Sequence, residues 1–440
     1  MKICLITNFF PPITVGGAEM VCHQTALGLK KAGNEVSVIV GHPHITPRMV
    51  PVAEYGIDGI SVHRIFPDRT LIPLWRRYKQ LYNANVEKLI EPLLRKIKPD
   101  IIHFHNLSGL TLSPIKLASK AGIPAVITMH DYWSLCPNNM LFTRNHEPCT
   151  HYSGKRFCVN CFHQYDYWGS LPYRQAIIKN EIERGTGRII TPSRFMADRI
   201  AEAGYSQEML RTIFHGLEIE TFRGQIKPLH EAGDALFSTG PDMAKAKAQI
   251  ESSDFLLQFA GHLTVHKGGE YLIRALSLLK KDHRHFTLAV TGLAHHQEIG
   301  RLRSLISALD IADNIIFLGK IDPQFLPSLY ARADAVVVPS IWYENASVVI
   351  AEAMMSGTPV IASDIGGNPE FVENGHNGLT FKPKDHIDLS RKIRCLLEDP
   401  SLVKDMRKNA LSRAFDLFNM TTHINSTRAC YDEAIARRGG

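Results

Sequence analysis

The sequence predicts an α/β protein made of two doubly wound parallel sheets. Short apolar runs alternate with amphipathic segments of helical period, a pattern typical of parallel strands joined by helices. The pattern starts at residue 2 and again at Phe255, and both times a glycine pair follows the first run. A chain of 440 residues also exceeds the usual size of a single hydrophobic core. We expect two Rossmann-like domains, residues 1–217 and 218–417, that face each other across a cleft, and a last helix, 418–440, that crosses back to the first domain.

The overall composition is that of a soluble globular protein. Hydrophobic residues make up 45% of the chain and charged residues 21%, and the net charge is +7. This mild positive excess fits anionic small molecules or an anionic membrane surface, and no basic run with interleaved aromatic residues indicates nucleic acid. The first ten residues read as a strand rather than a signal peptide, and no apolar run approaches the roughly 18 residues that span a bilayer. We expect a cytoplasmic protein, with peripheral contact to the inner face of the membrane as an option.

The first domain begins with a strand, a glycine-rich loop, a helix and a second strand. The strands cover about residues 2–9 and 35–40, and Gly33 ends the helix between them. Gly16 and Gly17 let the backbone approach a ligand closely, and the helix N-terminus behind them favours phosphate. On the residues alone, a plain tight turn is the commoner explanation of such a pair.

Two further strands of the first domain carry histidines. One contains His103 and His105, and the strand 124–133 ends in His130 and Asp131, followed by two aromatic residues. The carboxyl ends of parallel strands line the ligand crevice, so we expect these side chains at the active edge. A lone histidine is usually a structural residue, but the polar and aromatic setting of His130 favours a role in the site.

A basic segment precedes these strands, and it has two explanations. An ordinary solvated helix face is the commoner one. The other is an interfacial patch that reaches a lipid-linked acceptor. Its residues are Arg76, Arg77, Lys79, Arg95, Lys96 and Lys98.

Four cysteines lie in an irregular segment, residues 136–163, which we treat as an insertion in the first domain. Four soft ligands can hold zinc tetrahedrally and would staple a segment too polar to form its own core. The spacings differ from those of paired CxxC ribbons, so unbound thiols stay open as an alternative, and disulfide or redox chemistry as a third. Such a zinc would be structural, with no open position for catalysis. The four residues are Cys136, Cys149, Cys158 and Cys161.

The second domain repeats the opening of the first. A linker over residues 223–251 precedes the strand 255–260, and the loop after this strand carries Lys267 and the pair Gly268-Gly269. A lysine where a glycine-rich loop enters a helix is suited to a diphosphate.

Two glutamates mark the most informative stretch. Glu344 follows an apolar strand, and Glu352 stands eight residues later in a helix. Asn345, Ala346 and Ser347 begin this helix, where free backbone amides and the positive end of the dipole favour an anion. Carboxylates accept hydrogen bonds from hydroxyls, so the combination suits a sugar nucleotide. Without its context, the glutamate pair would more often be a solvated helix face.

This context resembles the Glu-x7-Glu signature of the retaining glycosyltransferases of family 4, and the resemblance spans nearly the full chain. The pattern is a strand, Pro339-Ser340, the aromatic pair Trp342-Tyr343, Glu344, a helix and the Gly366-Gly367 turn. The resemblance implies the GT-B fold and catalytic roles for His130, Lys267 and Glu344. It implies donor-binding roles for Gly16, Gly17, His262, Asn345, Ala346, Ser347 and Glu352.

One position departs from the family pattern. Where many members carry Gly-Arg-Leu, this chain has Gly261-His262-Leu263. Arginine supplies a permanent charge and a bidentate fork, whereas histidine is largely neutral near pH 7. We therefore expect donor affinity or its pH dependence to differ from that of relatives.

The resemblance implies transfer of a hexosyl unit from a UDP- or GDP-sugar to an acceptor hydroxyl, with retention, in polysaccharide or glycolipid biosynthesis. The acceptor would be a saccharide or a lipid-linked saccharide. No Asp-x-Asp motif falls in the right place, so we expect no metal or other cofactor in catalysis. Two alternatives stay open: an inactive sugar-nucleotide-binding regulator, which His262 alone supports, and a GT-B epimerase or phosphorylase.

Overall fold

The computed structural model describes most of the chain. The described residues are 1–13, 16–41, 51–67, 81–107, 109–150, 171–228, 241–282, 284–293 and 296–439.

The chain forms two compact units, each with its own sheet. The first unit comprises residues 1–141, 149–217 and 420–440, and the second comprises 142–148 and 218–419. The sequence predicts the whole cysteine-rich insertion in the first domain, but residues 142–148 group with the second unit. The reason is local: Lys384 forms an ion pair with Glu147 and donates a hydrogen bond to the backbone carbonyl of His146.

The sheet of the first unit has eight strands in the order β3-β4-β2-β1-β5-β6-β7-β8. All neighbours pair in parallel except β3 and β4, which form an antiparallel hairpin. Because the chain passes from β1 to one side and returns on the other, β1 and β5 flank a topological switch point, where α/β proteins bind ligands. The strands are β1 (Lys2–Thr7), β2 (Glu35–Val40), β3 (Val52–Ile57), β4 (Ile60–Ile65), β5 (Ile101–Phe104), β6 (Ala125–Thr128), β7 (Arg188–Thr191) and β8 (Leu210–Thr212).

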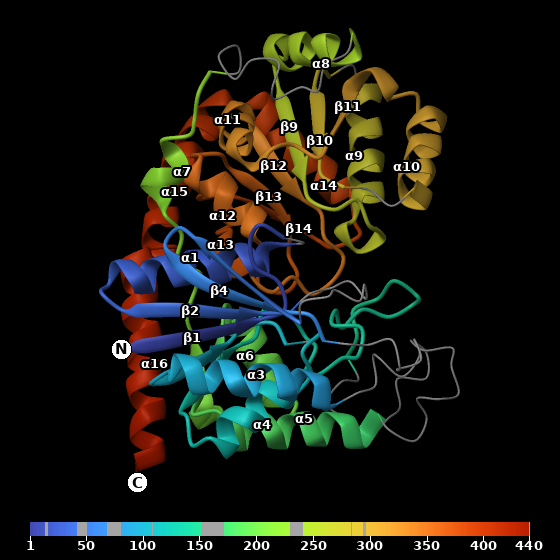
Figure 1. Cartoon of the computed structure of the whole chain (residues 1–440). Helices are drawn as coiled ribbons and strands as arrows, with labels where there is room; N and C mark the ends of the chain where they lie inside the picture. The colour runs from blue at the N-terminus through green and yellow to red at the C-terminus, as the bar shows by residue number, and fades with distance from the viewer. Residues whose placement is uncertain are drawn as a thin grey trace. The chain divides into compact units, whose positions relative to one another are not determined.

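Helices cover the first sheet (Figure 1). The last helix of the chain packs on β6, β7 and the first helix, and it buries Tyr431 completely. Its residues therefore belong to the core of the first unit although they lie at the other end of the sequence. The helices are α1 (Gly17–Lys31), α3 (Ala84–Ile97), α4 (Ser113–Lys120), α5 (Leu171–Gly185), α6 (Arg194–Glu202) and α16 (Met420–Gly439), with a short 3-10 turn η2 (Gln207–Met209).

The sheet of the second unit has six parallel strands in the order β11-β10-β9-β12-β13-β14. Here β9 and β12 flank the switch point, and the loops that carry Lys267 and Glu344 follow these two strands. The strands are β9 (Leu256–Ala260), β10 (Thr287–Thr291), β11 (Ile315–Gly319), β12 (Ala335–Val338), β13 (Val360–Ser363) and β14 (Gly378–Phe381).

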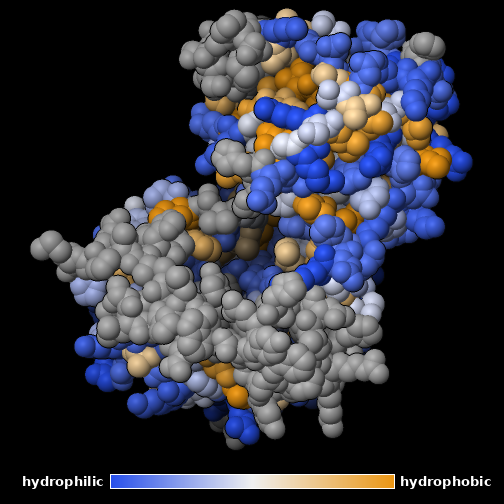
Figure 2. All heavy atoms as spheres, turned by 90° about the vertical axis from the view of Figure 1, so that its right-hand side faces the viewer, coloured by the Kyte–Doolittle hydropathy of each residue, from blue (hydrophilic) through white to orange (hydrophobic). Residues whose placement is uncertain are grey.

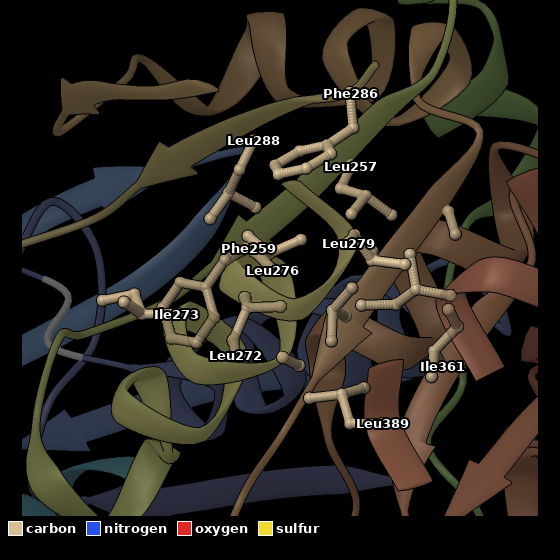
Figure 3. Packing of buried hydrophobic residues seen from close by; sticks show 14 of the residues in the cluster. Leu257, Phe259, Leu272, Ile273, Leu276, Leu279, Phe286, Leu288, Ile361 and Leu389 are labelled. Atoms are coloured by element: carbon tan, nitrogen blue, oxygen red, sulfur yellow. The ribbon is translucent and has the colours of Figure 1, made fainter. Parts of the chain in front are cut away.

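The core of the second unit lies between this sheet and its helices. Leu272, Ile273, Leu276 and Leu279 form the apolar face of one helix, and all four are buried against strand residues such as Leu257 (Figure 3). The helices are α7 (Ile219–Arg223), α8 (Pro241–Ser252), α9 (Gly269–Lys281), α10 (His296–Ala308), α11 (Leu326–Arg332), α12 (Val348–Met355), α13 (Asn368–Phe371), α14 (His386–Glu398) and α15 (Pro400–Leu417). Short 3-10 turns lie at η3 (Val265–Lys267), η4 (Ala312–Asn314) and η5 (Pro323–Phe325).

The surface carries few large apolar side chains. Hydrophilic residues predominate on the described face of the second unit, with small apolar patches between them (Figure 2). In the described part of the chain, no helix is long and apolar enough to cross a membrane. The basic residues Arg95 and Lys96 of α3 form exposed ion pairs with Glu91 and Glu54. Residues 76–79 of the predicted basic patch lie outside the described residues.

Candidate active site

An ion pair stands at the switch point of the second unit. Lys267 Nζ donates to Glu344 Oε1 over 2.6 Å, although the two residues are 77 positions apart in the sequence. The Glu344 side chain is 6% exposed and the Lys267 side chain 25%. The fold thus brings together two predicted site residues, one from the loop after β9 and one from the loop after β12.

The backbone of the lysine loop leaves no room for a side chain at Gly268. This residue has φ +72, and a Cβ on it would lie 1.8 Å from the carbonyl oxygen of Pro339. The carbonyl of His266 accepts a hydrogen bond from the amide of Ile341 over 2.9 Å. A glycine is therefore required for the two loops to approach and for Lys267 to reach Glu344.

Two neighbours that the sequence analysis did not single out as site residues also hold Glu344. Ser340 Oγ donates to Glu344 Oε1 over 2.6 Å, and Trp342 Nε1 donates over 2.9 Å. Burial by itself raises the pKa of Glu344, but the Lys267 ammonium and these hydrogen bonds lower it below its ordinary value. Glu344 is thus an ionised, oriented carboxylate, and within the described chain all three side-chain donors reach its Oε1, which leaves Oε2 as an acceptor.

The glycine turn after β13 supports the backbone of Glu344. The amide of Gly367 donates to the Glu344 carbonyl over 2.7 Å. Gly366 has φ +65, and a Cβ on it would lie 2.3 Å from the same carbonyl oxygen. A turn more than twenty residues away therefore sets where this carboxylate stands.

Helix α12 begins directly after this loop. Ser347 is its N-cap residue with extended backbone angles, and no side chain caps the helix through a hydrogen bond at that residue. Asn345 is buried, whereas Ala346 and Ser347 are partly exposed. The first amides of α12 and the positive end of its dipole therefore lie next to Glu344, an arrangement suited to an anion.

The second glutamate of the pair lies in α12. Tyr330 of α11 donates its hydroxyl to Glu352 Oε2 over 3.0 Å. Burial raises the pKa of Glu352 to about 7, and the hydrogen bond from Tyr330 only partly offsets this. Glu352 therefore titrates near neutral pH, unlike Glu344.

Two histidines, His262 and His266, precede Lys267 in sequence and differ in environment. The ring of His266 lies 5.0 Å from Trp342 and 6.2 Å from Phe142, between centroids. Burial and the adjacent Lys267 lower the pKa of His266 to about 4, so it is neutral at pH 7. His262 is exposed to solvent.

In the first unit, the glycine loop leads into α1. The amide of Gly16 donates to Glu19 Oε2 over 2.6 Å, and Glu19 is buried. Gly17 is the first residue of the helix. The Glu19 carboxylate therefore lies at the amides that the sequence predicts to bind phosphate, and it already accepts the hydrogen bond of the Gly16 amide.

A cluster of mostly buried histidines lies on the β5 side of the same switch point. His105 Nδ1 lies 2.9 Å from His130 Nε2, and the His130 ring stacks on that of His215 with 5.8 Å between centroids. Burial is the largest cause that lowers the pKa of each cluster member well below its ordinary value, and the other histidines add to it. These rings are therefore neutral at pH 7. The sequence analysis expected His103, His105 and His130 at this edge but did not foresee their mutual contacts.

Asp131 follows His130 and accepts two hydrogen bonds. Its Oδ1 accepts from the amide of Trp133 over 2.8 Å and its Oδ2 from Asn106 Nδ2 over 3.2 Å. Burial raises the pKa of Asp131 to about 7, and the nearby charge of Glu19 adds to this. Asp131 therefore titrates near neutral pH, beside histidine rings that are neutral at pH 7.

Half of the predicted zinc ligands can be placed. Cys136 is a buried thiol that donates to Asn138 Oδ1 over 2.6 Å, and burial raises its pKa. Cys149 is a partly exposed free thiol. Cys158 and Cys161 lie outside the described residues.

Comparisons with known proteins identify the family of this chain. The chain matches the family described as Glycosyltransferase Family 4 over residues 15–221 and the family described as Glycosyl transferases group 1 over residues 242–413. An uncharacterized glycosyltransferase of Methanocaldococcus jannaschii is 25% identical over 465 residues, which cover 100% of both chains.

Solved structures show the same fold. Sucrose-phosphate synthase of Thermosynechococcus elongatus matches with a TM-score of 0.74 and 21% identity over 99% of each chain. HepE of Anabaena, in complex with UDP, matches with a TM-score of 0.68 and 21% identity over 98% of this chain and 99% of that one. The family matches, the relatives and the fold agree: this chain belongs to the group 1 glycosyltransferases and has the GT-B fold.

Proposed function

We propose that this protein moves a hexosyl unit from a UDP- or GDP-sugar to an acceptor hydroxyl, with retention at the anomeric carbon. The acceptor would be a saccharide or a lipid-linked saccharide, as in polysaccharide or glycolipid biosynthesis. The observation that carries the proposal is the ion pair of the partly exposed Lys267 with the buried Glu344, beside the N-terminus of α12. It combines a cation for the diphosphate with an ionised carboxylate for sugar hydroxyls.

Each part of this site has a distinct task in the proposal. Lys267 and the amides of Ala346 and Ser347 stabilise the diphosphate as it leaves, because negative charge grows there in the transition state. Glu344 accepts hydrogen bonds from sugar hydroxyls, and Glu352 accepts them from the ribose. His262, Asn345 and the loop of Gly16 and Gly17 add polar contacts to the donor.

The reaction breaks the bond between the anomeric carbon and the phosphate oxygen and forms a bond from that carbon to the acceptor oxygen on the same face. The acceptor proton passes to the departing phosphate oxygen, so the step needs no separate protein base. His130 contributes a neutral polar contact near the sugar, because burial keeps its ring uncharged at pH 7.

Release of nucleoside diphosphate from a panel of UDP-, GDP- and ADP-sugars tests the proposal. Slow hydrolysis of one donor without acceptor, lost in Glu344→Ala and Lys267→Ala, would support it and identify the sugar. The stereochemistry of the product, read by NMR, then decides retention. Absence of both release and nucleotide binding across the panel would overturn the proposal.

An inactive sugar-nucleotide-binding regulator is the second candidate function. The family resemblance implies an arginine at this position, where the chain has the exposed His262. Tight binding of a nucleotide with no turnover, in the presence of a range of saccharide acceptors, would favour it. Turnover gained in His262→Arg would then show that the absence of an arginine at this position accounts for the inactivity.

We also propose that Cys136, Cys149, Cys158 and Cys161 hold a structural zinc. The buried thiol of Cys136 and the partly exposed thiol of Cys149 are soft donors suited to this metal. Elemental analysis of gently purified protein should find one zinc per chain, and Cys136→Ser should lower that number. A chain without zinc or iron would remove the proposal.

A peripheral contact with anionic membranes completes the proposal. Sedimentation with liposomes that contain anionic lipid should retain the wild-type protein and lose it when Arg76, Arg77 and Lys79 are replaced by glutamine. Binding that is absent from the start would contradict this contact.

A further inference from the structure

His105 stands directly behind His130 at the ligand edge of the first unit. It follows β5 in sequence, is 2% exposed, and its Nδ1 lies 2.9 Å from His130 Nε2. His130 lies just beyond the end of the neighbouring strand β6 and is partly exposed. His105 therefore touches the residue to which we give a contact with the sugar, without facing solvent itself.

The ring of His105 is held in place by a second histidine. His103 lies 4.2 Å from it, between ring centroids, and both ring nitrogens of His103 have partners. His103 Nδ1 is 2.8 Å from the Tyr431 hydroxyl and His103 Nε2 is 2.7 Å from Thr128 Oγ1. Partners from β6 and α16 thus hold His103, and the ring of His103 in turn packs against that of His105.

The unsatisfied nitrogen of His105 indicates its tautomer. All these histidines are neutral at pH 7 because burial lowers their pKa values, so each ring carries one N–H. His105 Nε2 is buried and has no hydrogen-bond partner among the described residues. A buried N–H without a partner is rarer in proteins than a buried acceptor without one. With its proton on Nδ1, His105 donates to His130 Nε2 and leaves at Nε2 a bare acceptor rather than an N–H without a partner.

We propose that His105 is a positioning residue that holds His130 in the tautomer with its proton on Nδ1. One nitrogen of a neutral histidine sets the state of the other, so accepting at Nε2 makes His130 a donor at Nδ1. His130 then meets the hexosyl donor as a neutral N–H group rather than as an acceptor. The role in transfer rests on the proposed function, whereas the tautomer is a property of the protein alone.

A matched pair of variants tests the tautomer. His105→Asn places an amide nitrogen near the position of Nδ1 and keeps a donor, whereas His105→Leu removes it. NMR of protein with 15N-labelled histidine reads which ring nitrogen is protonated, and the signals of His130 are those missing in His130→Gln. We expect an unprotonated Nε2 in the wild type and in His105→Asn, and a protonated fraction at Nε2 in His105→Leu. A wild-type His130 with its proton on Nε2 would overturn the proposal.

Turnover tests what the tautomer does. With UDP-glucose and GDP-mannose as probes, His105→Asn should keep nearly the wild-type kcat, and His105→Leu should lose about tenfold, the worth of one hydrogen bond. Equal kcat in the two variants, with folded spectra for both, would overturn the role in transfer. If the wild type neither binds nor turns over any donor of the full panel, the proposed function fails, and NMR alone still decides the tautomer.

Discussion

The ligand edges of the two units differ in charge. In the second unit, Lys267 and Glu344 form an ionised pair held by further hydrogen bonds. In the first unit, His103 and His105 are buried, His130 is partly exposed, and all three rings are neutral at pH 7. Both edges lie at a switch point of a parallel sheet, so the fold does not dictate this difference. This difference in charge fits the proposed ligands, an anion at the edge of the second unit and neutral polar groups at the edge of the first.

The largest expected effect comes from breaking the charged edge. Lys267→Ala and Glu344→Ala should each lower the rate of nucleoside diphosphate release by about 10²–10³, because stabilisation of the departing charge is lost. Lys280→Ala is the control, since Lys280 forms an exposed ion pair with Asp310 in the same unit. Comparable rates in Lys267→Ala and Lys280→Ala would contradict the assignment.

The histidine-containing edge of the first unit should lose folding stability in acid. The pKa values of its histidines are lowered below their ordinary value of 6.5, so the unfolded chain takes up protons first as pH falls. Their contribution is fully present above pH 6.5 and is lost below it, at up to about 1.4 kcal/mol per pH unit for each group. Hydrogen exchange followed by mass spectrometry at pH 7.5 and 5.5 should show β5 and β6 losing protection more than β9 and β12.

Replacing one histidine sharpens this comparison. His215→Asn removes one neutral ring from the cluster, so it should reduce the acid loss in β5 and β6. The exposed His376 provides the control, and His376→Gln should leave the loss unchanged. If both variants behave like the wild type, the cluster is not the cause of acid sensitivity.

The support behind Glu344 can be broken at a glycine. Gly366→Ala places a Cβ against the Glu344 carbonyl and adds the strain of φ +65. Gly375→Ala is a matched control, because Gly375 has φ +85 but no atom within 4 Å of the added Cβ. Both should lose about 1–2 kcal/mol of stability from backbone strain, but only Gly366→Ala should lose donor turnover as well. Thermal unfolding and the release assay measure the two effects, and equal turnover in both variants would show that the turn does not position Glu344.

The smallest effect concerns the second carboxyl of the charged edge. Because the pKa of Glu352 is raised to about 7, its ionised form gains population between pH 6 and 8. An ionised carboxylate accepts hydrogen bonds from ribose hydroxyls better than a protonated one, so affinity for UDP should rise about fivefold over this range. Calorimetric titration of wild type and Glu352→Gln separates this from the titration of UDP itself. Parallel pH profiles would assign the whole change to the nucleotide.

Local sequence pattern was sufficient for most of the fold. The apolar runs at residues 2–9, 35–40 and 255–260 are strands, and the helical face of Leu272, Ile273, Leu276 and Leu279 is buried. The fold class and the family are confirmed. The hairpin of β3 and β4 escaped prediction, because β3 lies at the sheet edge and its residues are only partly buried or exposed, so they carry a weak apolar signal.

The contacts of the insertion could not be read from its sequence either. Residues 142–148 group with the second unit because Phe142 lies against His266 and Glu147 pairs with Lys384. Nothing in a short polar segment states which distant residue will receive it, since such contacts depend on where the strands bring their loops. Tyr330, Ser340 and Trp342 gave no signal as partners of the glutamates for the same reason.

The sequence by itself determined the order of strands and helices and the residue types at each strand end, because periodicity and glycine placement are local properties. Tertiary structure alone decided the ionisation of those residues. Glu344 and Glu352 are eight positions apart in one motif, yet the pKa of one is lowered and that of the other is raised. Histidine is buried at position 105 and exposed at position 262. Burial and the distance to a countercharge arise only when distant segments pack together, and these two quantities set the charge of each site.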